Sequence, residues 1–229
     1  MTFLGRTVMI TGAAGNLGRA VAAAFAGRAA NLVMVDRRAA APPPQTKALA
    51  LEADLLDAAS VQAAVDQAIG RFGRIDVLCN LAGAFRMGSP VHETSAADWN
   101  FLLDVNARSL LNTARAVVPR MLAAGGGKIV NVGAYAAQKG AANMGAYVAS
   151  KSAVIRLTEA MAAELREHNI NVNCVLPTTL DTPENRAAMP QADPRRWVAP
   201  EDLAEAIAFL ASDAARAIHG AALPVTGLS

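Results

Sequence analysis

The chain has 229 residues, of which 53% are hydrophobic and 17% charged, and its formal net charge is +2. A hydrophobic fraction this large excludes an intrinsically disordered chain, and the length suffices for one complete α/β core. Lysines and arginines form no cluster of more than two residues. The chain therefore lacks the electrostatic footprint of a nucleic-acid-binding protein.

Compartment signals are few. No apolar run approaches the roughly 18 residues that cross a bilayer, so we predict no transmembrane segment and no membrane partner. A strand-like run follows Arg6 at once, and we expect no signal peptide. Cys79 and Cys174 both lie in apolar, strand-like runs. This placement predicts buried, reduced thiols in a cytoplasmic protein.

Strand-like and helix-like segments alternate along the chain. Aliphatic, β-branched runs predict strands at residues 7–11, 32–35, 75–79, 128–132, 170–176 and 222–225, with a weaker candidate at 49–51. Helical patterns occupy residues 15–26, 58–72, 98–122, 145–168 and 201–212. Asp57 is expected to cap the second of these helices. Strands with little polar alternation predict a doubly wound, mostly seven-stranded parallel sheet with helices on both faces.

Two stretches interrupt the alternation. A triple proline at residues 42–44 cannot lie inside a helix, so the second crossover helix is expected to be short or absent. Residues 178–197 form a proline-containing insertion directly after the strand at 170–176. Ligands bind beyond the carboxyl ends of parallel strands, so we predict that this insertion is a substrate lid. No linker divides the chain, and we predict a single domain spanning residues 1–229.

A glycine-rich turn lies between the first predicted strand and the first predicted helix. Residues 11–18 read Thr-Gly-Ala-Ala-Gly-Asn-Leu-Gly. Glycines allow a tight turn and let backbone N–H groups approach a pyrophosphate, and the helix N-terminus adds partial positive charge. In this context the pattern predicts a dinucleotide site, with a plain glycine-lined turn as the alternative. The predicted binding residues of the turn are Gly12, Gly15, Asn16, Leu17 and Gly18.

Asp36 ends the second predicted strand. A carboxylate there accepts hydrogen bonds from both ribose hydroxyls of NAD and repels the additional phosphate of NADP. Arg37 and Arg38 follow directly and can instead grip that phosphate. We therefore predict that NADH is preferred, with NADP as the alternative. Asp54, with Leu55 beside it, can reach the adenine edge or merely cap the next segment.

Taken in order, these motifs resemble the classical short-chain dehydrogenase/reductases. The counterparts of the family's motifs are residues 11–18, Asn80-Leu81-Ala82-Gly83, Asn106, Tyr147-Val148-Ala149-Ser150-Lys151 and Pro177. The resemblance covers essentially the whole chain. It implies a single Rossmann domain, a nicotinamide cofactor, and hydride transfer to or from a carbonyl-like carbon. It places further cofactor contacts on Asn80, Ala82, Gly83, Pro177, Thr178, Leu180 and Thr182.

Tyr147 and Lys151 stand at positions i and i+4, which places them on one face of a helix, about 6 Å apart along its axis. A neighbouring ammonium favours the phenolate and is expected to lower the pKa of Tyr147 from its usual value near 10. We predict that Tyr147 exchanges the proton and that Lys151 also holds the nicotinamide ribose. An ordinary Tyr–Lys pair is the alternative. By resemblance, Asn106 supports the lysine through a water, although a purely structural contact fits it equally.

Two residues depart from the family pattern. Asn16 stands where the middle glycine of the turn is usual, and Ala134 stands where the catalytic serine is expected. Both departures, and above all residues 176–197, resemble the quinonoid dihydropteridine reductase branch. That branch implies reduction of a quinonoid or other small carbonyl-like acceptor without a catalytic serine. An activated acceptor needs less polarisation, which is consistent with alanine at position 134.

The remaining predictions concern the substrate and other partners. Ala134, Met189 and Trp197 are predicted to contact the substrate, although Trp197 can equally anchor the lid. A non-catalytic dinucleotide-binding sensor or scaffold is the alternative function, and retention of the Tyr–Lys pair argues against it. We predict no metal site. In the family the helices at 98–122 and 145–168 pair across a two-fold axis, so a homodimer or homotetramer is expected.

Overall fold

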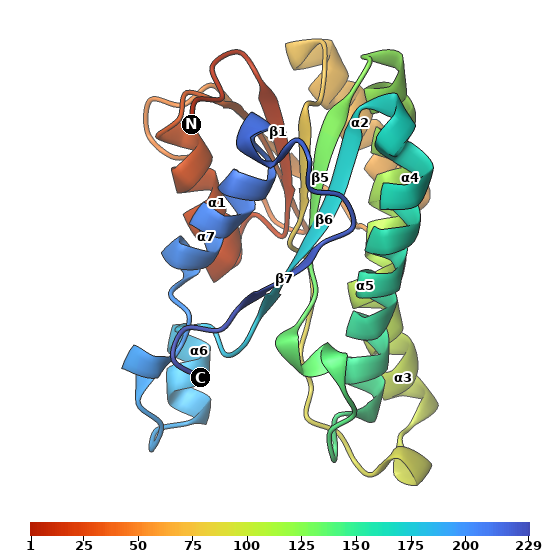
Figure 1. Ribbon diagram of the computed structural model, residues 1–229, viewed down its shortest axis with the longest axis vertical. Coiled ribbons are helices and arrows are strands. Elements are labelled where there is room, and N and C mark those ends of the chain that lie inside the picture. The colour runs from red at the N-terminus through yellow and green to blue at the C-terminus, as the bar shows by residue number, and fades with distance from the viewer.

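The computed structural model describes residues 1–229 and contains one seven-stranded sheet in which all neighbouring strands are parallel (Figure 1). Its strands are β1 (Thr7–Thr11), β2 (Asn31–Asp36), β3 (Ala48–Glu52), β4 (Val77–Asn80), β5 (Gly127–Val132), β6 (Ile170–Pro177) and β7 (Ala222–Val225). Their spatial order is β3-β2-β1-β4-β5-β6-β7. The two halves of the sheet meet between β1 and β4, which is the switch point where doubly wound sheets bind ligands. The predicted fold class is confirmed, the weak strand at 49–51 included.

Helices cover both faces of the sheet (Figure 1). On one face α1 (Asn16–Ala26) packs against α7 (Pro200–Leu210). On the other lie α2 (Ala58–Phe72), α4 (Ser109–Ala123) and α5 (Gly145–Leu165). The shorter α3 (Ala96–Leu103) packs on α5, and α6 (Pro183–Ala188) follows β6. None of these helices combines the length and the hydropathy that a membrane span needs.

The helix predicted over residues 98–122 is divided in the structure. A π-helical turn, Asp104–Arg108, separates α3 from α4. Such a turn inserts an extra residue into the helical repeat and is frequent at functional sites. Other local predictions are confirmed: Asp57 caps α2 by accepting a hydrogen bond from the backbone N–H of Ala59, and no helix forms around the triple proline at residues 42–44.

The insertion at residues 178–197 is more ordered than an irregular loop. It contains α6 and a single 3-10 turn, Pro194–Arg196. Its base is closed by two backbone hydrogen bonds, from Asp181 N–H to the Val198 carbonyl (2.8 Å) and from Val198 N–H to the Thr179 carbonyl (3.0 Å). The segment therefore leaves and rejoins the protein at one point beyond β6.

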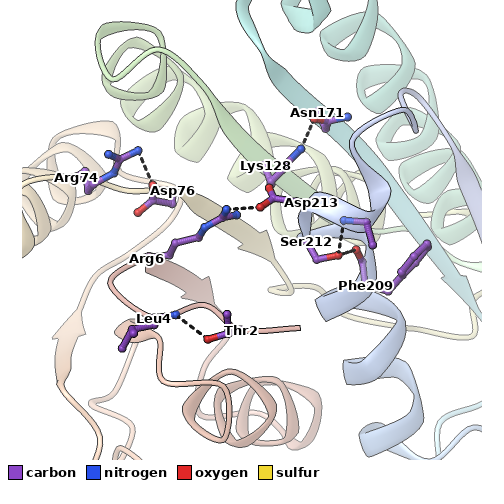
Figure 2. A network of polar contacts seen from close by, with 11 residues as sticks. Thr2, Leu4, Arg6, Arg74, Asp76, Lys128, Asn171, Phe209, Ser212 and Asp213 are labelled. Atoms are coloured by element: carbon purple, nitrogen blue, oxygen red, sulfur yellow. Dashed lines mark hydrogen bonds and ion pairs between the residues drawn. The ribbon is translucent and has the colours of Figure 1, made fainter.

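Polar contacts join the amino ends of the central strands (Figure 2). Arg6, just before β1, pairs with Asp213. The buried Lys128 of β5 donates to the side-chain oxygen of Asn171 in β6. These contacts lie at the edge of the sheet opposite to the carboxyl ends, which carry the predicted site.

A second polar chain crosses the core beneath the site. Thr113 donates to Asn80 Oδ1 (2.8 Å), Asn80 Nδ2 donates to Asn131 Oδ1 (2.9 Å), and Asn131 Nδ2 donates to the Thr158 hydroxyl (2.9 Å). All four side chains are buried. The chain links α4, β4, β5 and α5, so a fully satisfied polar network fixes the relative positions of these elements.

Replacing Asn131 by alanine should lower the free energy of unfolding by about 2–4 kcal/mol, because the Asn80 amide loses its acceptor and Thr158 loses its donor in the core. Urea denaturation measures this change. Asn100→Ala is the control, because Asn100 is exposed on α3 and makes no side-chain hydrogen bond. A loss for Asn131→Ala as small as that of the control would contradict the structural importance of the chain.

Candidate active site

A cleft of about 410 Å³ opens at the carboxyl ends of β1, β2 and β4. Its size falls within the 300–1,000 Å³ range of small-molecule and cofactor sites. Most of the predicted cofactor residues line it, namely Gly12, Gly15, Asn16, Leu17, Gly18, Asp36, Arg37, Asp54, Leu55, Ala82, Gly83, Leu180 and Thr182. The structure thus brings these residues together, and their contact with a cofactor stays a prediction.

The glycine turn is packed too closely for side chains. A Cβ on Gly18 would lie 2.2 Å from the Gly12 carbonyl oxygen and 2.7 Å from Ala13 Cα. Gly12 has φ +68°, and its Cβ would lie 2.9 Å from the Ala82 nitrogen. Because Gly15 is extended, α1 begins at Asn16, one residue later than predicted.

The first turn of α1 contains unpaired backbone hydrogen-bond donors. The backbone N–H groups of Asn16, Leu17 and Gly18 have no acceptor in the protein. Three free donors at a helix N-terminus, beside a turn without side chains, fit a pyrophosphate. The residues present therefore suit a dinucleotide.

Asp36 is held against the same turn. Its carboxylate accepts from Ala14 N–H (2.9 Å) and Arg37 N–H (2.7 Å). The Arg37 side chain is largely exposed, and its guanidinium lies 3.9 Å from Asp54. The carboxylate is thus the more firmly placed group at this end of the cleft. Asp54 lines the cleft and also accepts from Leu56 N–H (2.9 Å), so its position fits both interpretations.

Three elements converge at Gly83, which lines the cleft, whereas Lys151 and Asn106 lie behind it and do not line the cleft. Lys151, 6% exposed, donates to the Val132 carbonyl at the end of β5 (2.8 Å). Asn106 reaches the same point from the π-helical turn. A Cβ on Gly83 would lie 2.8 Å from Asn106 Oδ1 and 3.1 Å from Lys151 Nζ. Glycine at position 83 is what lets β4, α5 and the π-helical turn come this close.

Asn106 fastens the loop after β4. Its Oδ1 accepts from Ala84 N–H (2.9 Å), and its Nδ2 donates to the Ala84 carbonyl (3.0 Å) and to the Ser150 hydroxyl (2.9 Å). These bonds use both N–H donors of the amide and one of the two lone pairs of its oxygen. They support the structural interpretation of Asn106, and its water-mediated support of Lys151 stays a prediction.

Burial governs the titration of the Tyr–Lys pair. It raises the pKa of Tyr147 to about 12 and lowers the pKa of Lys151 to about 8. The expectation that Lys151 lowers the pKa of Tyr147 is therefore wrong for this structure. The Lys151 ammonium donates to Val132 instead, and the phenol ring packs edge-on against Phe85, with ring centroids 4.9 Å apart. The phenol is protonated at neutral pH.

Ala134 lies in an apolar cluster behind Tyr147. The cluster also contains Ala137 and Cys174, and Tyr147 packs against it. The hydroxyls of Ser150 and Ser152 on α5 donate to the carbonyls of Tyr147 and Ala137. Neither serine therefore replaces the donor that alanine at position 134 lacks.

Some predicted cofactor residues lie outside the cleft. The Asn80 amide belongs to the buried polar chain, and the Thr178 hydroxyl donates to the Thr226 carbonyl (3.0 Å). Pro177 ends β6 and does not line the cleft either. Contacts of these residues with a cofactor stay predictions, and the Thr178 hydroxyl can still accept a hydrogen bond while it donates to Thr226.

The insertion at residues 178–197 contacts the glycine turn. Asn16 Nδ2 donates to the Glu184 carboxylate (2.7 Å), which explains how a side chain at this position is accommodated. Thr182 caps α6 by accepting from Asn185 N–H (3.2 Å). Met189 is 38% exposed on the insertion. Trp197 is half-buried beside the closed base of the insertion, and the role of the insertion as a substrate lid stays a prediction.

Sequence analysis missed several residues that line the cleft: Ala53, Leu56, Leu81, Val105 and Ser109. Three of them are chain neighbours of predicted residues. Val105 and Ser109 lie in and directly after the π-helical turn, and the apolar stripe of an apparently continuous helix gives no signal for such a turn.

A smaller recess of about 180 Å³ has Tyr147 among its lining residues. It is formed by the loop after β4, by α3, and by the start of α5 with the residues before it, and its lining includes Arg86, Asp98, Met87 and Met144. Sequence analysis missed this recess as well. Its two charged residues are twelve positions apart and belong to no motif.

Known proteins match this chain over nearly its whole length, both in sequence and in fold. The sequence profile of the family described as short chain dehydrogenase matches residues 6–193. D-threitol dehydrogenase of Mycolicibacterium smegmatis is 37% identical, and the match covers 97% of this chain and 92% of that protein. Cis-4-hydroxycyclohexanecarboxylate dehydrogenase of Sinomonas cyclohexanicum is 36% identical, covering 98% and 96%. Carveol dehydrogenase from Mycobacterium avium, solved in complex with NAD, has a TM-score of 0.88 and 28% identity, covering 98% and 97%.

Lys151→Met should stabilise the cofactor-free protein at pH 7 by about 2 kcal/mol. Below pH 8 both the folded and the unfolded chain carry the ammonium, so the folded chain bears the full cost of burying it. A pKa lowered from 10.5 to about 8 corresponds to roughly 3 kcal/mol, and the lost bond to Val132 offsets about 1 kcal/mol.

The gain should shrink as the pH rises from 8 toward 10.5, because the folded chain releases its proton before the unfolded chain does. Thermal unfolding at pH 7 and pH 10 measures the effect. Lys47→Met, at an exposed lysine, is the control. A gain independent of pH would contradict the electrostatic explanation.

Proposed function

The chain belongs to the short-chain dehydrogenase family, and from that premise we propose that it transfers hydride from NADH to a small carbonyl-like or quinonoid acceptor, with Tyr147 as the proton donor. As a member of the family the protein is an oxidoreductase. One observation carries the proposal. Tyr147 and Lys151 stand on one face of α5, and Lys151 comes within close approach of Gly83 at the inner end of a cleft with three free backbone donors.

NADH is the cofactor that the site residues favour. The free N–H groups of α1 would hold the pyrophosphate, and Asp36 would accept from the ribose hydroxyls. The carveol dehydrogenase that this fold resembles was solved with NAD. When bound, the nicotinamide supplies the hydride.

Tyr147 would supply the proton. Its phenol is protonated at neutral pH, which suits a donor in the reducing direction. The acceptor would gain hydride at the carbonyl carbon of a ketone or at a ring nitrogen of a quinonoid dihydropterin, and a heteroatom of its conjugated system would take the phenolic proton. Tyr147 would then be a phenolate that solvent reprotonates. The Lys151 ammonium would stabilise that phenolate. The charge of Lys151 therefore contributes most after Tyr147 has released its own proton.

The missing serine restricts the acceptor. Removing one donor from the oxygen of a ketone typically costs about 2.7–4 kcal/mol in the transition state. A conjugated, electron-poor acceptor needs less polarisation. Alanine at position 134 and the resemblance of residues 176–197 together favour a quinonoid dihydropteridine as the first acceptor to test.

A second candidate is an ordinary secondary alcohol or its ketone. The two relatives at 37% and 36% identity are named for D-threitol and cis-4-hydroxycyclohexanecarboxylate, neither of which is quinonoid. On this candidate the protein would oxidise a small polyol or a ring alcohol with NAD.

The test follows NADH and NADPH oxidation separately with freshly generated quinonoid dihydropterin, and NAD reduction with D-threitol. Tyr147→Phe should lower kcat at least about 100-fold on the true substrate, because it removes the proton donor and little volume. Turnover with dihydropterin supports the first candidate, and turnover with threitol alone supports the second. Rapid NADPH oxidation alone would contradict the argument from Asp36. Tight NADH binding without turnover of any compound would favour the non-catalytic sensor.

Ala134→Ser should change turnover of the quinonoid acceptor less than about threefold while raising turnover of an unactivated ketone about tenfold or more, because only the ketone needs the second donor. Steady-state kinetics on both acceptors check this. Ala137→Ser is the matched control, since it adds a hydroxyl to another buried alanine of the same cluster. A large gain on the quinonoid acceptor would refute the activated-acceptor argument.

A further inference from the structure

Arg86 and Asp98 form an ion pair in the wall of the recess beside Tyr147. Arg86 Nη1 lies 2.8 Å from Asp98 Oδ1, and each side chain is about half-exposed, at 50% and 48%. The guanidinium lies over the Phe101 ring, 3.8 Å from its centroid. The other Asp98 oxygen accepts from the Ser95 hydroxyl (2.7 Å). Both partners are therefore fixed by a third group, unlike an isolated surface pair.

Arg86 and Asp98 both retain hydrogen-bonding capacity that no other protein group uses. A guanidinium has five N–H donors, and Arg86 uses one of them within the protein. Each Asp98 oxygen accepts from one other side chain, and a carboxylate has about four lone-pair sites. The wall of the recess thus presents unused donors and unused acceptors side by side.

The charge balance indicates what such a wall can bind. Hydrogen bonds from Ser95 and Arg86 lower the pKa of Asp98, so the carboxylate is ionised at neutral pH. No other charged residue lines the recess. An anion drawn to Arg86 would meet Asp98, and a cation drawn to Asp98 would meet Arg86. A neutral group that both donates and accepts meets neither repulsion.

We infer that the recess is a specificity subsite for a neutral part of the substrate that presents a hydrogen-bond donor and an acceptor side by side, with Arg86 donating and Asp98 accepting. Neighbouring hydroxyls of a polyol and the amide edge of a ring lactam share this chemistry. The inference rests on the proposed function, because Tyr147 is among the residues that line the recess.

Size and lining agree with a subsite. At about 180 Å³ the recess is smaller than the 300 Å³ at which complete ligand sites begin, so it holds one end of a substrate whose reacting carbon lies nearer the cofactor cleft. Met87, Leu102 and Met144 supply apolar wall around the charged pair. Polar groups outweigh apolar ones in this lining, and such groups orient a ligand through hydrogen bonds.

The test compares three ketones with NADH: 4-oxocyclohexanecarboxamide, 4-oxocyclohexanecarboxylate and cyclohexanone. We expect the highest kcat/KM for the carboxamide. Arg86→Gln and Asp98→Asn should each lower that value roughly 10- to 100-fold and leave cyclohexanone unchanged, because cyclohexanone has no group for the pair to bind. Arg120→Gln is the matched control, since Arg120 lies 2.8 Å from Asp66 with similar exposure and far from the recess. A wild-type preference for the carboxylate, or an equal loss on all three ketones, would overturn the subsite.

Binding separates this inference from the proposed function. Ligand-observed NMR with the NAD-loaded protein should show binding of cyclohexanecarboxamide that Arg86→Gln abolishes, and no binding of cyclohexanecarboxylate. This result supports the subsite even if no ketone is reduced, whereas carboxamide binding that is absent, or that survives the substitution, overturns it. D-threitol and δ-valerolactam as further probes show whether hydroxyls or a lactam edge fit better, and failure of both overturns the shared chemistry.

Discussion

One close approach, that of the Gly83 backbone to the side chains of Asn106 and Lys151, determines the geometry of the site. Any Cβ at position 83 would lie 2.8 Å from Asn106 Oδ1. Without it, the loop after β4 bonds through Ala84 to the Asn106 amide, and this amide in turn bonds to Ser150 on α5. The π-helical turn supplies the asparagine at the required depth. Direct hydrogen bonds therefore join loop, turn and helix, and Gly83 lines the cleft while Tyr147 lines the recess.

This packing buries the Lys151 ammonium, and burying a charge is electrostatically unfavourable. Lys151 is almost completely shielded from water, and its only hydrogen-bond acceptor is a neutral backbone carbonyl and not a carboxylate. Burial shifts the pKa of Lys151 down and that of Tyr147 up, so both shifts disfavour charge in the cofactor-free site. In the proposed reaction the phenolate would form where burial disfavours charge, and the Lys151 ammonium would offset part of that cost.

Structural features that follow from a local sequence pattern were predicted. Features that depend on where a side chain points in the folded protein were missed. Buried strands alternating with helices led to the sheet, and the glycine turn led to the cleft, because both signals are contiguous in the chain. The spacing of Tyr147 and Lys151 gave the shared helix face and then the wrong pKa shift, since spacing does not reveal that the ammonium donates to Val132. The π-helical turn was hidden in an unbroken apolar stripe. Arg86 and Asp98 meet only because the loop after β4 folds over α3.

The two departures from the family pattern act at opposite ends of the site. Asn16 adds a side chain to the glycine turn, and its bond to Glu184 connects α6 to that turn. Ala134 lacks the hydroxyl that serine would place beside Tyr147, and it contributes to the apolar cluster against which Tyr147 packs. A site with fewer donors at the reacting atom polarises its substrate less, so discrimination must come from groups farther away. The fixed Arg86–Asp98 pair lies beside the recess that Tyr147 adjoins and supplies such groups, and selectivity for the substrate would then be determined by the recess more than by the catalytic residues.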